Sequence, residues 1–286
     1  MMQARFFVMC LLAATLIAGC GDGDGDDNRV WRSPQQISDI SSTVNAPQVA
    51  VDSLGNVLVV WEQDDAIYSS RFDFLTRTWS APTNVSTGSL LARAPVVDTD
   101  PDRNAVVAWS DSGVINSVRY NSVLALWGTP VTISNSLAFS QPPQMLSDLL
   151  GNQTVVWQQI YNSLFSTCVS RYDASGSTWG TAEVLSSGVV PRETPQVSSD
   201  PSGNVFVVWE ELGVIESSTY DSISQTWGAP ISLGSGRDPQ ISVAANGSAI
   251  VVWDAPSSIQ ARYYLQGVGW GVARDIGSGD FPEIAV

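Results

Sequence analysis

The 286-residue chain contains no histidine and no lysine, and these absences restrict what it can do. Histidine is the commonest general base and transition-metal ligand, so any catalytic site here depends on carboxylates, Tyr or Arg. The 13 basic residues are all arginines and face 28 Asp and Glu residues, giving a formal net charge of −15. Nucleic-acid binding needs clustered positive charge, so nucleic acid is not an expected partner. The sequence predicts no cofactor and no metal site.

Cysteines and helical patterns are also scarce. Cys10 and Cys20 lie near the N-terminus, and Cys168 is the single cysteine of the remaining chain, so no disulfide framework is expected. Without a His to activate it, we expect Cys168 to be an apolar filler rather than a reactive thiol. No helical period of useful length follows the first 20 residues, and Val, Thr, Ser, Trp and Gly dominate. This composition predicts an all-β chain.

What the chain does contain is one segment repeated five times. A Pro opens each copy, a Trp follows 14 residues later, and a second Trp follows after 17, 18 or 22 more. The prolines are Pro47, Pro95, Pro143, Pro195 and Pro239, the first tryptophans are Trp61, Trp109, Trp157, Trp209 and Trp253, and the second tryptophans are Trp79, Trp127, Trp179, Trp227 and Trp270. A period of about 48 residues with four strands is typical of a β-propeller blade.

Local chemistry places strands A to D in each copy. Strand A begins at the Pro, as in residues 47–51, and a turn rich in Asp, Gly and Asn follows. Strand B is an unbroken apolar run that ends at the first Trp, as in residues 204–209. Strand C contains an Arg beside a Tyr or Phe, and strand D begins at the second Trp. We therefore predict four-stranded antiparallel blades, with strand B covered on both faces by the neighbouring blades.

The N-terminus reads as a secretory signal. Residues 1–19 have an apolar core too short to span a bilayer. The segment Ile17-Ala18-Gly19-Cys20 resembles the lipobox of bacterial lipoproteins, although an ordinary cleavage site that contains a Cys is an alternative. The resemblance implies that Cys20 is lipidated and holds the chain on the membrane. Residues 20–30 then form an acidic tether, for which we prefer a flexible spacer to a calcium loop. Gly21 after the Cys implies the outer membrane.

The two ends of residues 31–286, the predicted propeller domain, contain incomplete copies. Residues 31–38 read as a strand D, and residues 281–286 read as the strand A of a sixth copy. Five blades with spare strands, a truncated six-bladed ring, and assembly with another chain all fit this pattern. We favour five complete repeats plus an incomplete sixth.

Length variation between the copies falls on one predicted face of the blades. The A–B and C–D turns share one end of an antiparallel blade, and the B–C turns and D–A crossovers share the other. Four extra residues lie in the B–C turn of the third copy around Tyr161, and the D–A crossover is shorter in the last copies. Insertions on one face of a repeat protein often mark the binding face.

Candidate ligand-binding residues lie on that variable face. Arg93, Arg192 and Arg237 each precede a strand A Pro by two or three residues. Three convergent guanidinium groups are suited to hold a carboxylate or a sulfate. The B–C turns add Asp64, Asp65, Asp111, Glu210, Glu211 and Asp254, with Gln158, Gln159 and Tyr161 from the longer turn. The alternative is that these residues are solvated turn charges.

The repeated residues suggest structural roles instead. Tryptophans at a fixed phase are expected to pack between blades rather than to bind sugars. The strand C arginines are expected to pair with turn carboxylates, and Thr219 interrupts their series. These arginines are Arg71, Arg119, Arg171 and Arg262, and the carboxylates are Asp52, Asp100, Asp148 and Asp200.

The wording PQVAVD-x-x-GN-x-x-VVW, then RY or RF, then WG-x-P, resembles tandem propeller-like repeats of bacterial secreted and lipid-anchored proteins. More distantly it is similar to the Asp-box propellers of sialidases. The first resemblance implies a lipid-anchored, non-catalytic module that binds a protein or a glycan. The second implies a glycan-active enzyme in which the three arginines hold a substrate carboxylate, although spacing identifies no Tyr and Glu pair as nucleophile. A purely structural envelope protein is a third interpretation.

Overall fold

The computed structural model describes residues 34–39, 41–135, 142–161, 164–189 and 195–284. In this part of the chain all regular secondary structure is β, and 25 strands form five antiparallel sheets. No helix among these residues has the length and apolarity needed to cross a membrane. The all-β prediction is therefore confirmed.

The five sheets follow one another along the chain. Sheet 1 consists of β1 (Val44–Val51), β2 (Val57–Gln63), β3 (Ala66–Asp73), β4 (Thr78–Trp79) and β5 (Thr83–Asn84). Sheet 2 consists of β6 (Ala92–Thr99), β7 (Ala105–Asp111), β8 (Val114–Asn121), β9 (Leu126–Trp127) and β10 (Val131–Thr132). Sheet 3 consists of β11 (Gln144–Ser147), β12 (Gln153–Tyr161), β13 (Leu164–Asp173), β14 (Thr178–Trp179) and β15 (Glu183–Val189). Sheet 4 consists of β16 (Gln196–Ser199), β17 (Val205–Glu211), β18 (Val214–Asp221), β19 (Thr226–Trp227) and β20 (Ile231–Ser235). Sheet 5 consists of β21 (Arg237–Val243), β22 (Ala249–Ala255), β23 (Ser258–Leu265), β24 (Gly269–Trp270) and β25 (Arg274–Gly277).

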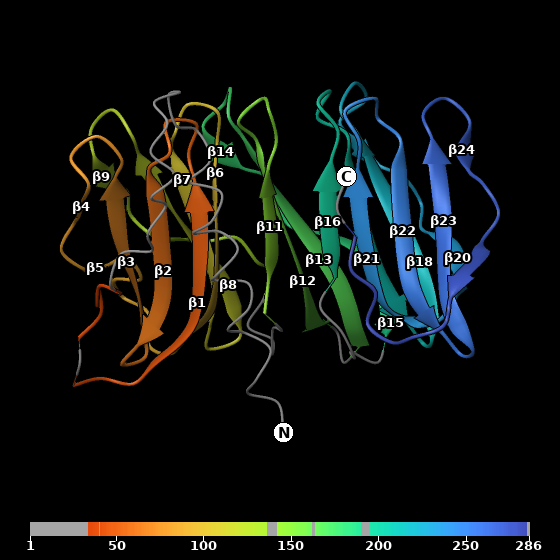
Figure 1. Cartoon of the computed structure of the whole chain (residues 1–286), viewed down its shortest axis with the longest axis horizontal. Helices are drawn as coiled ribbons and strands as arrows, with labels where there is room; N and C mark the ends of the chain where they lie inside the picture. Colours follow the sequence, from red (N-terminus) through yellow and green to blue (C-terminus); the bar gives the residue numbers. More distant parts are fainter. Residues whose placement is uncertain (1–33, 40, 136–141, 162–163, 190–194, 285–286) are drawn as a thin grey trace, which may run out of the picture.

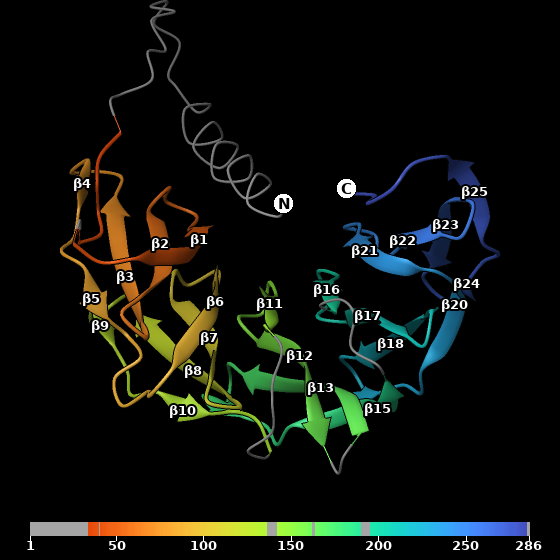
Figure 2. The same cartoon turned by 90° about the horizontal axis from the view of Figure 1, so that it is seen from below.

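The sheets stand side by side around a common centre, as in a propeller. Their strands run parallel to the viewing plane of Figure 1, and Figure 2 shows the sheets as an open arc. The first strand of each sheet, strand A, lies nearest the centre (Figure 2). Contacts join β1 to β6, β6 to β11, β11 to β16 and β16 to β21. The predicted propeller of four-stranded antiparallel blades is confirmed, and each blade is one sheet.

Strand B is covered on both faces, as predicted, and its Trp belongs to the packing between blades. All five first tryptophans are buried. Trp209 shares a core with Leu146 and Leu185 of sheet 3, and Trp253 shares one with Ile215 and Leu233 of sheet 4. Replacing such a ring by Ala typically costs about 3–5 kcal/mol. Sheets 2 to 5 are therefore each held to the preceding sheet by a buried strand B indole.

The first residues of strand A differ from the prediction. In sheets 1, 2 and 5 the strand begins two or three residues before the Pro, and a bulge surrounds the Pro. The residue before the Pro has a positive φ in each case, 45° at Ala46, 49° at Ala94 and 53° at Asp238. Pro has no N–H to donate to the ladder, and a bulge is a place where none is needed. The Pro therefore stands inside the strand and not at its first position.

Strand D and the third B–C turn also differ from the prediction. Strand D is split in every sheet into two short segments that both pair with strand C, such as β9 and β10. A Pro lies between the segments in sheets 1, 2 and 4, but sheets 3 and 5 have the same break without one. The four extra residues of copy three lengthen both arms of a hairpin, with Tyr161 opposite Leu164, rather than forming a loop. Residues 162–163 lie outside the described part.

The two predicted terminal strands do not form in the described residues. Residues 34–39 contain no strand, and residues 31–33 lie outside the description together with the signal, Cys20 and the tether. Residues 281–284 also form no strand. A strand needs a hydrogen-bonded neighbour, and the pairings end with β25 on β23. The prediction that both ends of the domain form β-strands is therefore wrong for residues 34–38 and 281–284.

The crossover from sheet 4 to sheet 5 gives a test of the indole packing. A Cβ added at Gly236 would lie 2.3 Å from Cδ1 of Trp253 and 2.5 Å from the Asp254 carbonyl oxygen. We expect Gly236→Ala to lower the free energy of unfolding by about 2–4 kcal/mol, because ring or backbone must move. Denaturant unfolding monitored by Trp fluorescence measures this change.

Gly279→Ala is the matched control. Gly279 has a φ of 149°, close to the 158° of Gly236. A Cβ there meets no atom within 4 Å. The same backbone penalty then applies without the clash, and we expect a loss of about 1 kcal/mol. Equal losses in the two variants would show that the contact with Trp253 is not what requires glycine.

Candidate functional site

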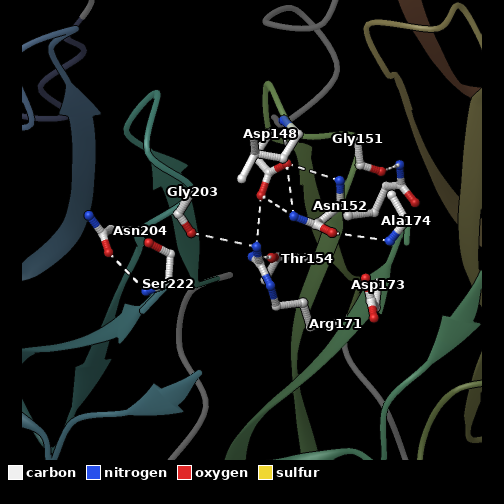
Figure 3. A network of polar contacts seen from close by, with 12 residues as sticks. Asp148, Gly151, Asn152, Thr154, Arg171, Asp173, Ala174, Gly203, Asn204 and Ser222 are labelled. Carbon is white, nitrogen blue, oxygen red and sulfur yellow. Dashed lines mark hydrogen bonds and ion pairs between the residues drawn. The ribbon is translucent and has the colours of Figure 1, made fainter. Parts of the chain in front are cut away.

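The turn between strands A and B is built around a buried Asp in sheets 1 to 4. In sheet 3 the Asp148 carboxylate accepts hydrogen bonds from the backbone N–H groups of Leu150 and Asn152, each at 2.9 Å, and from the Asn152 amide (Figure 3). Asn152 Oδ1 accepts the backbone N–H of Ala174, 3.0 Å away, in the C–D turn. The A–B and C–D turns therefore share one end of the blade, as the strand order requires.

The strand C arginine completes this network, as predicted. Arg171 places one guanidinium nitrogen 2.7 Å from Asp148 and another 2.9 Å from the hydroxyl of Thr154 (Figure 3). The same guanidinium lies over the ring of Tyr220 in the next blade, 4.5 Å from its centroid. A buried carboxylate is costly unless it is paired, and this Arg supplies the pairing and an inter-blade cation–π contact together.

Two more boundaries between blades have the same arrangement. Arg71 pairs with Asp52 and lies 5.5 Å from the Tyr120 ring centroid. Arg119 pairs with Asp100 and lies over Tyr172 in the same way. The predicted pairing of strand C arginines with turn carboxylates is confirmed for these residues. The repeated charges thus stabilise the fold.

In sheet 4 a different pair of residues makes the inter-blade contact. Thr219 replaces the Arg, and its cross-strand neighbour is Phe206. The Phe206 ring lies edge-on to Tyr264 of sheet 5, with 5.0 Å between centroids. An apolar ring therefore takes the place of the guanidinium. Only the pairing register reveals this exchange, because the two residues are 13 positions apart.

The prediction that Arg262 is the fourth member of the strand C arginine series is wrong. Tyr264 pairs with Ala249 just as Phe72 pairs with Val57, which puts Tyr263 at the Arg position. Arg262 instead donates to the Gly271 and Ser232 carbonyl oxygens, at 2.5 and 2.9 Å. The C–D turn of copy five is one residue shorter than that of copy one. Arg262 therefore has the same spacing to the second Trp as the other arginines, although it occupies a different position in strand C.

The predicted arginine cluster is not assembled by any contact among the described residues. Arg93 forms an ion pair with Asp65, and Arg237 forms one with Asp254 at 2.7 Å. The two arginines belong to sheets 2 and 5, and Arg192 lies outside the described part. Convergence of the three guanidinium groups stays a prediction.

Most of the predicted carboxylates on the variable face stabilise turns or neighbouring groups. Buried Asp111 accepts the backbone N–H groups of Leu90 and Leu91. Asp64 accepts the Ser42 hydroxyl at 2.7 Å, and Glu211 accepts the Trp209 indole N–H at 3.3 Å. Gln159 accepts the Trp157 indole N–H in the same way, and Gln158 is buried beside it. The side chain of Tyr161 lies outside the description.

One pocket does gather several of the predicted residues. Glu210, Arg237 and Asp254 line a cavity of about 460 Å³ together with Ser257 and Asp280. Three carboxylates and one guanidinium make it acidic. It lies at the B–C end of sheet 5, where the segment after β25 returns toward the centre.

Two further grooves were not predicted and lie at the opposite end, between blades. A groove of about 380 Å³ separates sheets 1 and 2, and a groove of about 550 Å³ separates sheets 3 and 4. They are called groove 1–2 and groove 3–4. Groove 1–2 is lined by Leu58, Ser69, Arg71, Asp73, Thr78, Trp79, Ser80, Thr83, Tyr120, Ala125 and Trp127. Groove 3–4 is lined by Leu150, Asn152, Arg171, Asp173, Ser175, Thr178, Gly180, Glu183, Tyr220, Ser222, Gln225 and Trp227.

The grooves arise from the second tryptophans. Trp127 and Trp227 are half-buried and pack on Tyr120 and Tyr220, with 5.3 and 5.4 Å between ring centroids. Each ring also packs against the core between its own sheet and the preceding one, and the part of the ring that is left uncovered lines the groove. The prediction that the tryptophans pack between blades is confirmed for Trp109, Trp157, Trp209 and Trp253, and Trp127 and Trp227 also pack on these cores. What the sequence did not predict is that Trp79, Trp127 and Trp227 line grooves as well.

Other reactive groups are protected. Cys168 is buried in the core between sheets 2 and 3, as expected of a filler, and its burial raises the pKa of the thiol to about 12. No group of three or more potential metal ligands occurs in the part of the chain that the structure describes.

The buried ion pairs give a second test. Arg119 exposes 28% of its side chain and Asp100 only 2%. We expect Arg119→Met to reduce the free energy of unfolding by about 2–3 kcal/mol, since the buried carboxylate loses its partner while solvent partly compensates. Arg103→Met removes the same charge from an exposed turn and should change stability by less than about 0.5 kcal/mol. Equal midpoints for the two variants in denaturant titrations would count against the structural role of the pair.

No protein-family model matches the chain, and no curated protein matches it. Among solved structures it is similar to a protein of unknown function from Dyadobacter fermentans, with a TM-score of 0.52, 13% identity, and 78% of this chain and 79% of that chain covered. It is also similar to the Dos1 propeller, with a TM-score of 0.53, 12% identity, and coverage of 89% and 68%. A third similar structure is polysaccharide lyase Uly1, with a TM-score of 0.50, 10% identity, and coverage of 77% and 70%. At these identities the similarity shows the fold alone, and that fold is the β-propeller.

Proposed function

We propose that this chain is a non-catalytic binding module of the bacterial cell envelope, and that its ligand is a glycan held in the grooves between blades. The observation that carries the proposal is the recurrence of one groove at two blade boundaries. The propeller fold is compatible with this role, since polysaccharide lyase Uly1 shares it.

The two grooves present matching side chains. Five residues of groove 1–2 have a counterpart in groove 3–4. The pairs are Arg71 and Arg171, Asp73 and Asp173, Thr78 and Thr178, Tyr120 and Tyr220, and Trp127 and Trp227. The arginines and tyrosines join neighbouring blades, while the half-buried indole beside them lines each groove, so the chain offers the same surface twice. The repetition therefore favours a ligand that itself repeats, as a polysaccharide does.

The chemistry of the grooves fits sugar units. An indole face offers an apolar surface to the C–H side of a pyranose ring, while hydroxyl, amide and carboxylate groups accept and donate hydrogen bonds at its edges. Groove 3–4 adds Asn152, Ser222 and Gln225 to this set. Two weak sites on one rigid body bind a long glycan more tightly than either site alone.

The aspartates that the two grooves share do not suit the general acid of a glycosidase. A general acid of this class needs a carboxyl with a raised pKa. The side-chain hydrogen bond from Ser175 lowers the pKa of Asp173, and the backbone hydrogen bond from Thr76 lowers that of Asp73. Both carboxylates remain ionised and act as hydrogen-bond acceptors. The sialidase-like alternative loses support because Arg93 and Arg237 already pair with carboxylates.

The proposed location follows from the N-terminal sequence. Lipidation of Cys20 holds the chain on the membrane, and residues 21–30 let the propeller reach its ligand. The position of Gly21 favours the outer membrane. These residues lie outside the described part, so the proposal rests on the lipobox resemblance.

The groove tryptophans provide the test of ligand binding. We expect the purified protein to bind neutral or acidic polysaccharides on a glycan array, and Trp127→Leu together with Trp227→Leu to weaken binding by at least about tenfold, because stacking is lost in both grooves. Calorimetry with the best array ligand then gives the affinity of each single variant. Each single variant should retain one working groove.

Trp270→Leu is the matched control for folding. Trp270 packs on Tyr264 with 5.4 Å between centroids but lines neither groove. It should lose similar stability and keep full binding. A folded protein that binds no glycan, or a Trp270 variant as weak as the groove variants, would overturn the proposal in favour of a protein partner.

The anchor is tested separately. We expect fatty-acid labelling of cells producing the full chain to mark the protein, and Cys20→Ser to abolish the label and release the protein from membrane fractions. Cys168→Ser should leave both unchanged, because that thiol is buried. Label retained in the Cys20 variant would contradict lipidation at this residue.

A further inference from the structure

The charged side chains of the two grooves bear on which glycans they accept. Among the residues that line them, each groove has one basic side chain, Arg71 in groove 1–2 and Arg171 in groove 3–4. Each groove also has one Asp of the C–D turn, and groove 3–4 adds the exposed Glu183. The charge that a ligand meets therefore depends on whether the two arginines are available to it.

Both arginines are already held by groups of the fold. A guanidinium nitrogen of Arg71 lies 2.8 Å from the carboxylate of Asp52, whose side chain is 3% exposed. Arg171 lies 2.7 Å from the fully buried carboxylate of Asp148. A Tyr ring of the next blade also packs against each guanidinium. An incoming carboxylate or sulfate would have to draw the Arg away from a buried charge, which is costly. The positive charge of each Arg is thus balanced within the fold.

The two groove aspartates carry a charge that their turns do not need. Oδ1 of Asp73 accepts the backbone N–H of Thr76, 2.8 Å away. In sheet 2 the same position is Asn121, and its Oδ1 accepts the N–H of Leu124 at 2.8 Å. A neutral amide oxygen is therefore sufficient for this turn. The negative charge of Asp73, and of Asp173 at the same position in sheet 3, exceeds that need.

We propose that the grooves select neutral glycans and exclude chains with carboxylate or sulfate groups, and that Asp73 and Asp173 set this selectivity. The inference rests on the proposed glycan function and narrows its ligand. An anionic sugar on the groove indole meets a carboxylate whose neighbouring Arg is already paired, so like charges repel. A neutral sugar donates its hydroxyl groups to the same carboxylate. The net charge of −15 acts in the same direction over a longer range.

The two grooves are expected to differ in strength. Arg77 belongs to the C–D turn that borders groove 1–2, and its guanidinium lies over the Phe74 ring, 4.2 Å from the centroid. The corresponding residue beside groove 3–4 is Ser177, and Glu183 adds a second negative charge to that groove. Groove 3–4 should therefore exclude anionic chains more strongly than groove 1–2.

The probes are pairs of glycans that differ chiefly in charge. They are cello-oligosaccharides beside their carboxymethyl derivatives, and methyl-esterified oligogalacturonates beside the free acids. Binding of the full-length protein in detergent is measured on an array and by calorimetry. In about 0.01 M salt, where the Debye length is about 30 Å, the charged member of a pair should bind at least about fivefold more weakly. In about 1 M salt, where that length is about 3 Å, the pair should agree within about twofold.

Two double variants locate the selectivity. Asp73→Asn with Asp173→Asn keeps the turn oxygens and removes one charge from each groove. In low salt it should strengthen binding of the charged glycans at least about threefold and change binding of the neutral ones by less than about twofold. Asp64→Asn with Asp275→Asn is the control, since it removes the same total charge from exposed residues that line neither groove. The difference within each pair should then persist.

The outcomes distinguish this inference from the proposal on which it rests. Neutral glycans that bind, with an exclusion of charged ones that only the groove variant relieves, support the selectivity. Charged glycans that bind as well as neutral ones overturn the selectivity and leave the glycan function standing. The same holds for a difference that the groove variant leaves unchanged or that the control variant removes equally. A folded protein that binds no glycan of either kind overturns both.

Discussion

The whole arrangement depends on an indole placed between neighbouring sheets. Each blade boundary buries one strand B Trp against aliphatic residues of the preceding sheet, as Trp209 does against Leu146 and Leu185. The core clusters of the described residues each combine side chains of two neighbouring sheets, so a blade is stabilised by the blade beside it. Positions 234 and 236 require glycine, because the crossover passes directly over the ring of Trp253 and a Cβ at either position would clash with it.

A second layer of contacts fixes the other end of each boundary, and it permits substitution in a way the indole does not. The Arg171 guanidinium neutralises Asp148 and lies on Tyr220, so it joins turn, strand and next blade. In sheet 4 the same contact is made by Phe206 while Thr219 replaces the Arg. Both boundaries therefore keep a planar group in contact with the Tyr ring of the following blade. The positive charge of the Arg neutralises the buried Asp of its own blade.

Sequence reasoning recovered what is periodic and missed what depends on register. The fixed interval from Pro to the first Trp was sufficient to predict the blades, the buried strand B and the pairing of Arg119 with Asp100. Arg262 was misplaced because a turn one residue shorter kept its spacing to Trp270, and the spacing cannot show which face a strand presents. The grooves were missed for a related reason. A half-buried Trp127 and a buried Trp109 look alike in sequence, since the strand that covers one of them comes from another blade.

The same repetition that stabilises the fold also limits where function can lie. Residues that recur in every blade, such as the strand B Trp, belong to packing, and the variable-face carboxylates are mostly used by turns, as Asp111 is. What remains are surfaces where the pattern is present but its usual partner is not. Between blades, Trp127 and Trp227 turn one side toward a groove. Recognition by this protein is thus expected at the grooves between its blades, which Trp127 and Trp227 line.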